Sequence, residues 1–204
     1  MRPSPSPRVT AYAVLAALFL LAALASRRPE LAVLALPFAI RIAFKPIPWS
    51  RTVDSIEAAA DVLLRADFPG LGIALDAFAT FEDPNVFDDL DMLDPERILL
   101  VQLSDYLWPQ MRSTQEQLAT ARHFRVFPGE GVHGDTLSTL VTRLDKMGYY
   151  GSYSFAVYND DYRQLPPEVV AGRAQGAAMW LGETVLRRSL PVPNMQRLRP
   201  TGPR

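Results

Sequence analysis

The chain has 204 residues, of which 49% are hydrophobic and 21% charged, and this composition favours a folded domain over a disordered chain. The formal net charge of −1 argues against a nucleic-acid partner, because such partners are bound by basic surfaces. With no cysteine and two histidines, the sequence excludes disulfides, thiolate zinc sites, cysteine nucleophiles and three-histidine zinc sites.

Residues 9–26 form an 18-residue run without a charged side chain. As a helix this run spans ~27 Å, close to the ~30 Å hydrocarbon core of a bilayer. Three interpretations remain open: a single transmembrane anchor, a secretory signal cleaved after Ala23–Ala25, or an alanine-rich helix of a soluble core. We therefore expect a hydrophobic helix within residues 1–30, in a chain that is either membrane-anchored with a cytoplasmic domain or cytoplasmic.

The next part of the chain alternates predicted helices, strands and loops. Asp54 and Glu57 have the spacing of a capping box, which predicts a helix beginning there. The region Glu82–Glu96 carries seven acidic residues and two prolines, which predicts a solvated loop with at most a short helix at Val86–Met92. Two apolar runs, Gly72–Asp76 and Ile98–Leu103, predict buried strands, and both are followed by polar side chains.

The alternation continues to the end of the predicted domain. The expected elements are a short helix at Gln115–Ala121, a strand at Phe124–Phe127, a helix from Asp135 or Thr136 to Gly148, a strand at Ser152–Tyr158 and a helix from Pro166 to Val185. Such an order is typical of an α/β fold whose parallel sheet is built from βαβ units. Polar residues at the carboxyl ends of the strands indicate a barrel or an open sheet that binds its ligand at that edge.

Five stretches in this order resemble the sugar phosphate isomerase/epimerase family, the xylose-isomerase-like TIM barrels that include 3-dehydroshikimate dehydratases. They are Arg41–Trp49, Leu71–Ala79, Leu100–Asp105, Arg122–Gly131 and Gly148–Asp160. The resemblance implies the fourth to eighth strands of a (β/α)8 barrel. It therefore predicts a partial TIM barrel over residues 31–193, behind the N-terminal hydrophobic helix, and an irregular tail over residues 194–204.

The resemblance also implies a divalent-metal site, Mn²⁺ or Mg²⁺, at the mouth of the barrel. Asp76 and Gln102 stand at two of the four ligand positions of the family, whereas Lys45 and Ala156 stand where the family has glutamates. Ala79 replaces a histidine that is usual shortly after the aspartate. Because a dication needs compensating negative charge, we expect that the metal is not bound tightly. A physical alternative is that the Lys45 ammonium replaces the metal and pairs with Asp76.

For the substrate, the resemblance implies a small carbohydrate-like ligand, a polyhydroxylated carbonyl compound. Lys45, His123 and Arg125 are the candidate substrate-binding residues, although a histidine such as His123 is more often a surface or packing residue. The segment Pro128–Gly131 is either an ordinary turn or a phosphate site before the next helix.

Two kinds of function remain open from the sequence. The first is an isomerase/epimerase or dehydratase with an impaired metal site. The second is a non-catalytic, membrane-tethered binding or interaction module, or a truncated or fused chain without activity. Open edges of an incomplete sheet also predict either a homo-oligomer that pairs through these edges or coverage of the edges by residues 9–40.

Overall fold

The computed structural model describes residues 41–81 and 86–188 of the chain. These form two compact units, one reaching to Gln102 and including Met147–Ser154, the other comprising Leu103–Lys146 and the chain from Phe155 onward. The hydrophobic helix expected within residues 1–30 and the tail expected over residues 194–204 lie outside the described residues. Within the described ranges, no helix is both long and apolar enough to cross a membrane.

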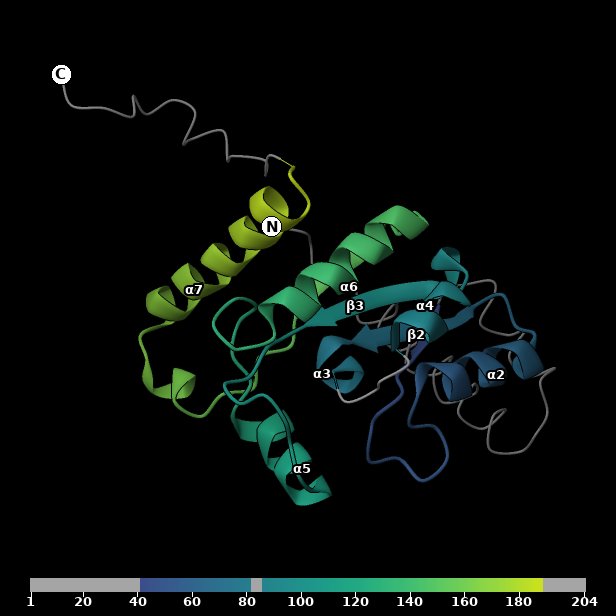
Figure 1. Cartoon of the computed structure of the whole chain (residues 1–204), viewed down its shortest axis with the longest axis horizontal. Coiled ribbons are helices and arrows are strands. Elements are labelled where there is room, and N and C mark those ends of the chain that lie inside the picture. The colour runs from purple at the N-terminus through teal and green to yellow at the C-terminus, as the bar shows by residue number, and fades with distance from the viewer. Residues whose placement is uncertain (1–40, 82–85, 189–204) are drawn as a thin grey trace, which may run out of the picture. The chain divides into compact units, whose positions relative to one another are not determined.

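The first unit contains a sheet of four strands in the order β1-β2-β3-β4. The strands are β1 (Ile42–Phe44), β2 (Leu71–Asp76), β3 (Ile98–Leu103) and β4 (Ser152–Phe155). β2 pairs in parallel with both β1 and β3, and all six of its residues are buried, as expected for a continuous apolar run covered on both faces. The parallel sheet predicted from the sequence is therefore confirmed (Figure 1).

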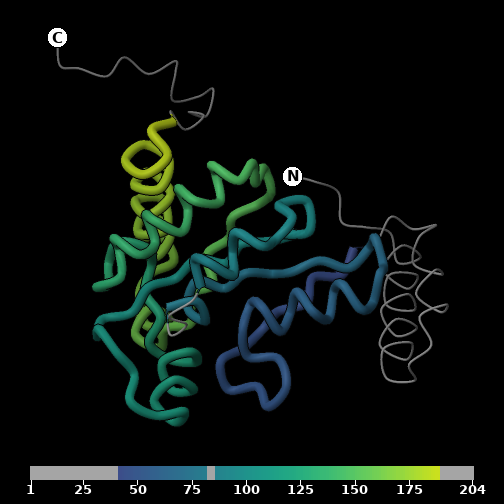
Figure 2. The backbone as a smooth tube through the Cα atoms, turned by 45° about the vertical axis from the view of Figure 1, so that its right-hand side comes forward, coloured from purple at the N-terminus to yellow at the C-terminus, as the bar shows by residue number. Residues whose placement is uncertain are grey.

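Helix α2 (Ile56–Ala66) lies along β2 (Figure 2). It begins after Ser55, whose Oγ accepts a hydrogen bond from the Ala58 N–H at 3.1 Å. The predicted capping box at Asp54 is therefore wrong by one residue, because serine is an equally good N-cap and its extended backbone aims the hydroxyl at the first turn. The helix ends at Asp67, which adopts a left-handed conformation at φ 42°.

Gly72 occupies an irregular part of the sheet where a side chain cannot fit. The register between β2 and β3 shifts at Ile73/Ala74, which marks a bulge. A Cβ added to Gly72 would lie 2.3 Å from the Arg97 carbonyl oxygen and 2.5 Å from the Leu99 Cγ. Glycine at this position therefore permits the close approach that sets the register of Asp76 opposite Gln102.

Short helices fill the connections of the first unit. They are α3 (Ala77–Thr80), α4 (Val86–Asp91) and the 3₁₀ turn η2 (Pro95–Arg97). α4 agrees with the short helix predicted at Val86–Met92, whereas α3 was not predicted. Arg97 of η2 donates from Nη1 to the carbonyls of Phe68 and Leu71, both at 2.9 Å, and so ties the start of β2 to the start of β3.

The second unit consists mainly of helices, and the strand predicted at Phe124–Phe127 is wrong. Its elements are α5 (Thr114–His123), α6 (Gly134–Met147), η3 (Tyr162–Gln164), α7 (Pro167–Met179) and the π-helical segment η4 (Trp180–Val185). In place of a strand, the chain makes two isolated antiparallel bridges, Asp105 with Val126 and Phe124 with Asn159. The run ends at Pro128, which cannot donate to a ladder, so it is too short to sustain one.

The periodicity of α6 was predicted correctly. Leu137, Leu140, Val141 and Leu144 are buried along one face. Gly148 follows the helix with φ +88°, the left-handed conformation that ends many helices. The predicted strand Ser152–Tyr158 is shorter in the structure and ends at Phe155.

The bulge at Gly72 generates a stability prediction. Gly72→Ala should lower the free energy of unfolding by about 1–3 kcal/mol, because the new methyl group meets backbone that cannot move without breaking the ladder. Gly172→Ala is the matched control: it lies in α7 with nothing within 4 Å of the added Cβ, and it should be neutral or stabilising by up to ~1 kcal/mol. Urea unfolding measures both, and equal effects at the two positions would contradict the prediction.

Candidate functional site

Three polar side chains meet at the carboxyl ends of β1, β2 and β3. The Lys45 Nζ lies 2.5 Å from the Asp76 Oδ2 and donates to the Gln102 Oε1 at 2.8 Å. The Asp76 side chain is 1% exposed, whereas that of Lys45 is 32% exposed. The ion pair expected between Lys45 and Asp76 is therefore present, and the Lys45 side chain is partly exposed to solvent.

Asp76 is held from both of its carboxylate oxygens. While Oδ2 faces the Lys45 ammonium, Oδ1 accepts a hydrogen bond from the Phe78 N–H at 3.2 Å and caps α3. The cap was not predicted, although an aspartate directly before a short apolar segment is a recognisable capping signal. The two contacts fix the orientation of a carboxylate that has almost no access to water.

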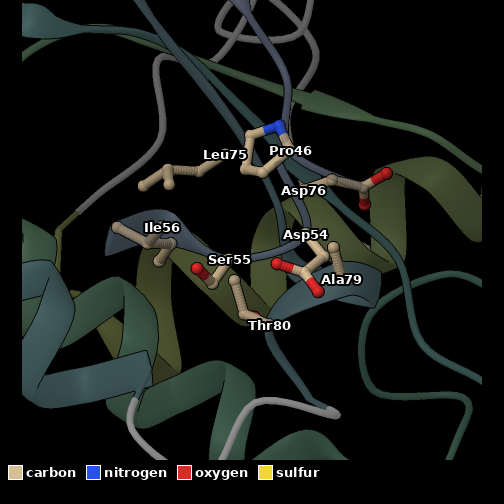
Figure 3. Close-up of a pocket in the computed structure, with 8 residues that line it drawn as sticks. All are labelled: Pro46, Asp54, Ser55, Ile56, Leu75, Asp76, Ala79 and Thr80. Carbon is tan, nitrogen blue, oxygen red and sulfur yellow. The ribbon is translucent and has the colours of Figure 1, made fainter. Parts of the chain in front are cut away.

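A shallow hollow lies beside Asp76, but it is not a ligand pocket of useful depth. It has an empty volume of about 260 Å³, part of it open solvent, and is lined by Pro46, Asp54, Ser55, Ile56, Leu75, Asp76, Ala79 and Thr80. Figure 3 shows the Asp76 carboxylate turned away from the Asp54 side chain. The carboxylate of Asp54 makes the hollow unsuited to an anion, and the Ser55 hydroxyl already caps α2.

The other two candidate residues belong to the second unit. His123 is an exposed side chain whose Nδ1 lies 2.8 Å from the Asp160 Oδ2, and Arg163 approaches the same carboxylate at 3.6 Å. Arg125 is 4% exposed, and its guanidinium lies 5.7 Å from the centre of the Tyr158 ring. The structure brings Lys45 together with Asp76 and Gln102, and it places His123 in a separate surface ion pair.

The turn Pro128–Gly131 is filled by its own acidic side chain. Glu130 accepts hydrogen bonds from the Phe127 N–H at 3.1 Å, from the Tyr162 hydroxyl, and from the Arg173 Nη1 at 2.9 Å. The Arg173 guanidinium also lies 5.1 Å from the centre of the Tyr162 ring. A carboxylate in this position repels a phosphate, so the structure favours the ordinary turn of the two interpretations.

Asp105 is a buried carboxylate whose structural role the sequence did not reveal. It is 0% exposed, and its Oδ1 accepts from the N–H groups of Tyr106 and His133 at 2.8 and 3.1 Å. Gly131 passes so close that an added Cβ would lie 2.3 Å from this oxygen. The glycine after Glu130 is the signal that could have indicated the close approach.

In the described part of the chain, the two candidate ligand residues Asp76 and Gln102 both contact a lysine ammonium. Across residues 41–81 and 86–188, no three or more histidine, aspartate or glutamate side chains gather where a metal could bind. The oxygens of Asp76 and Gln102 face the Lys45 ammonium. Mg²⁺ needs oxygen ligands at about 2.0–2.1 Å, and it would have to displace that ammonium to reach them. Ala156, at the other position where the resemblance implies a glutamate, is buried and offers no side-chain ligand atom.

A parallel α/β sheet with polar side chains at the carboxyl ends of its strands is the arrangement found in (β/α)8 barrels. The sequence matches the xylose isomerase-like TIM barrel family over residues 15–181, and the chain belongs to that family.

Similar proteins indicate how this chain relates to the family. It is 34% identical over 147 residues to a 3-dehydroshikimate dehydratase of Pseudomonas aeruginosa, covering 71% of this chain and 22% of that protein. A xylose isomerase-like TIM barrel/4-hydroxyphenylpyruvate dioxygenase fusion protein is 28% identical, with a TM-score of 0.65 over 78% of this chain and 25% of that one. IolI, solved with a bound zinc atom, shares the fold at 19% identity and a TM-score of 0.64, covering 77% and 54%. The chain spans about a fifth of the dehydratase.

The ion pair at the site generates a stability prediction. Lys45→Met leaves the buried Asp76 carboxylate without its cation and should cost about 2 kcal/mol of unfolding free energy. Adding Asp76→Asn should recover most of that loss, because the amide oxygen can still cap α3 while the charge is gone. A double-mutant cycle in urea measures the coupling, and additive effects of the two changes would contradict a direct pair.

The Glu130 cluster predicts a pH dependence at alkaline pH. Burial, followed by the hydrogen bond to the Glu130 carboxylate, raises the pKa of Tyr162 from 10.0 to about 12. Between these two values the folded chain keeps a proton that the unfolded chain has lost, so stability should fall as pH rises through this window. Tyr162→Phe should flatten that part of the pH profile, measured by thermal unfolding from pH 9 upward. An unchanged profile in the variant would contradict the assignment.

Proposed function

We propose that this chain binds a small polyhydroxylated carbonyl compound at the Lys45–Asp76–Gln102 cluster without a divalent metal. The observation that carries the proposal is the position of the Lys45 ammonium, within hydrogen-bond distance of both family ligand residues that the chain retains. In this proposal the ammonium takes the place of the metal as the cation of the site.

Electrostatics support one cation at this site rather than two. Charges of +1 and +2 held roughly 4 Å apart repel by on the order of 8 kcal/mol at an effective dielectric constant of about 20. Asp76 is the single carboxylate of the cluster, and its charge is already balanced by Lys45. Binding of a dication would therefore leave the cluster with an uncompensated positive charge.

The ammonium also has the means to bind a ligand oxygen. A lysine ammonium carries three N–H donors, and the contacts with Asp76 and Gln102 use two of them. Among the described residues no further partner of Lys45 is found, and its side chain is 32% exposed. A carbonyl or hydroxyl oxygen of the ligand can accept the third hydrogen bond.

Dehydratase or isomerase activity is the second candidate function. The 34% identity to a 3-dehydroshikimate dehydratase favours it, and this family chemistry requires a developing enolate to be stabilised by a nearby positive charge. An ammonium supplies one charge where a metal supplies two, so any such activity should be far below that of a metal-dependent dehydratase. Incubation with 3-dehydroshikimate and detection of the dehydrated product tests it directly.

Ligand binding in the presence of EDTA tests the leading proposal. Ligand-observed NMR with 3-dehydroshikimate and a panel of ketoses should detect binding that EDTA leaves unchanged. Lys45→Met should weaken it at least about tenfold, the value of one charge-assisted hydrogen bond. Lys146→Met, which removes the same charge from an exposed position on α6, is the matched control and should bind normally. Binding that requires added Mn²⁺ would overturn the proposal.

Metal titration provides an independent test of the same proposal. Calorimetry should find no stoichiometric Mn²⁺ binding to the native chain. Lys45→Glu removes the ammonium and adds a carboxylate beside Asp76 and Gln102, and should bind Mn²⁺ at least about tenfold more tightly than Lys45→Gln. Tight Mn²⁺ binding by the native chain would contradict the proposal, because it would mean that the metal displaces the Lys45 ammonium.

A further inference from the structure

The loop that follows β1 carries a tryptophan at the same end of the sheet as Lys45. The Ser50 N–H donates to the Ile47 carbonyl at 2.9 Å, which closes a turn with Pro48 and Trp49 at its two central positions. The Ser50 hydroxyl oxygen accepts two further backbone hydrogen bonds, at 3.3 and 3.1 Å. The proline and these three hydrogen bonds pre-organise the loop and hold Trp49 near the carboxyl end of β1.

Phe78 packs against the indole of Trp49. The two ring centres lie 6.5 Å apart and the ring planes meet at 66°, which is an edge-to-face contact. Phe78 is 1% exposed, and its N–H donates to the Asp76 Oδ1 at 3.2 Å. A single buried residue thus contacts both the indole and the carboxylate that pairs with Lys45, and all four residues belong to the first unit.

The indole retains groups that can contact a ligand. Trp49 is only half-buried, although its neighbour Phe78 is buried. Among the described residues none accepts a hydrogen bond from the Trp49 Nε1–H, so this donor is available to a ligand hydroxyl. Small-molecule sites typically combine aromatic side chains with a few placed polar groups, and the Lys45–Asp76–Gln102 cluster supplies the polar groups here.

We propose that Trp49 is a ligand-contacting residue of this site and that it selects cyclic polyhydroxylated carbonyl compounds over acyclic ones. The inference rests on the proposed function, in which the Lys45 ammonium binds a ligand oxygen. The C–H face of a ring stacks on the indole while the carbonyl oxygen accepts from the Lys45 Nζ. A short acyclic ketose offers the same oxygen but little apolar surface, so it gains affinity from Lys45 alone.

Two ligands and three variants test the inference by ligand-observed NMR. 3-Dehydroshikimate presents a ring, whereas monomeric dihydroxyacetone presents a hydroxylated carbonyl group that cannot close into one. Trp49→Ala should weaken binding of 3-dehydroshikimate about five- to tenfold and leave that of dihydroxyacetone within about twofold, because only the ring loses its stacking surface. Trp49→Phe keeps an aromatic face and should weaken 3-dehydroshikimate binding about two- to threefold. Lys45→Met should weaken the binding of both ligands.

The outcomes separate this inference from the proposed function. If Lys45→Met weakens binding but Trp49→Ala changes neither ligand, or changes both equally, the role of Trp49 is overturned and the proposed function stands. If the native chain binds neither ligand, both are overturned.

The native chain provides a readout that does not depend on the alanine variant. Its three tryptophans give three indole N–H resonances, and the resonance absent from Trp49→Phe belongs to Trp49. Saturating 3-dehydroshikimate should shift this resonance, and dihydroxyacetone should leave it in place. A Trp49 resonance that 3-dehydroshikimate does not shift overturns the inference.

Discussion

The carboxylate of Asp76 has almost no access to water, and a lysine ammonium compensates its charge. This charge compensation organises the first unit of the molecule. Lys45 supplies the charge from the end of β1, and Gln102 holds the same ammonium from β3. Three neighbouring strands are thus joined at their carboxyl ends by one ammonium, in the region where TIM-barrel proteins carry their chemistry.

The same interaction sets the chain apart from what its family resemblance implies. A divalent cation polarises a bound oxygen strongly because it brings two charges and open coordination positions. An ammonium brings one charge and directional hydrogen bonds, most of them already committed here to Asp76 and Gln102. Such a group is better suited to recognising a ligand oxygen than to stabilising an enolate. The proposed function follows from this difference in charge.

The sequence predicted those parts of the fold in which a single physical signal dominates. β2 and β3 are largely apolar runs, so burial alone predicts two strands. α6 has an apolar stripe and is followed by a glycine, so burial and capping both predict a helix with this end. The Lys45–Asp76 pair was predictable because the resemblance places a cation and a carboxylate at neighbouring ligand positions.

The predictions that were wrong or missing concern segments for which several local conformations have similar free energies. Either Asp54 or Ser55 can cap α2, and only the backbone conformation selects the serine. Phe124–Phe127 has strand composition, yet its ladder partners are decided by the rest of the molecule. The cluster of Glu130, Tyr162 and Arg173 joins residues far apart in the chain, and no spacing rule indicates such a contact.

Asp76 serves two partners at once, and this gives the site a built-in thermodynamic linkage. Its Oδ2 balances Lys45, while its Oδ1 accepts a hydrogen bond from the Phe78 N–H in the first turn of α3. A ligand that draws the ammonium toward itself changes the charge felt by the carboxylate and therefore the strength of the cap. If a ligand binds to Lys45 as proposed, reciprocity requires that fraying of α3 changes the affinity of Lys45 for that ligand by the same free energy. Under the proposed function, the stability of α3 therefore depends on whether a ligand is bound to Lys45.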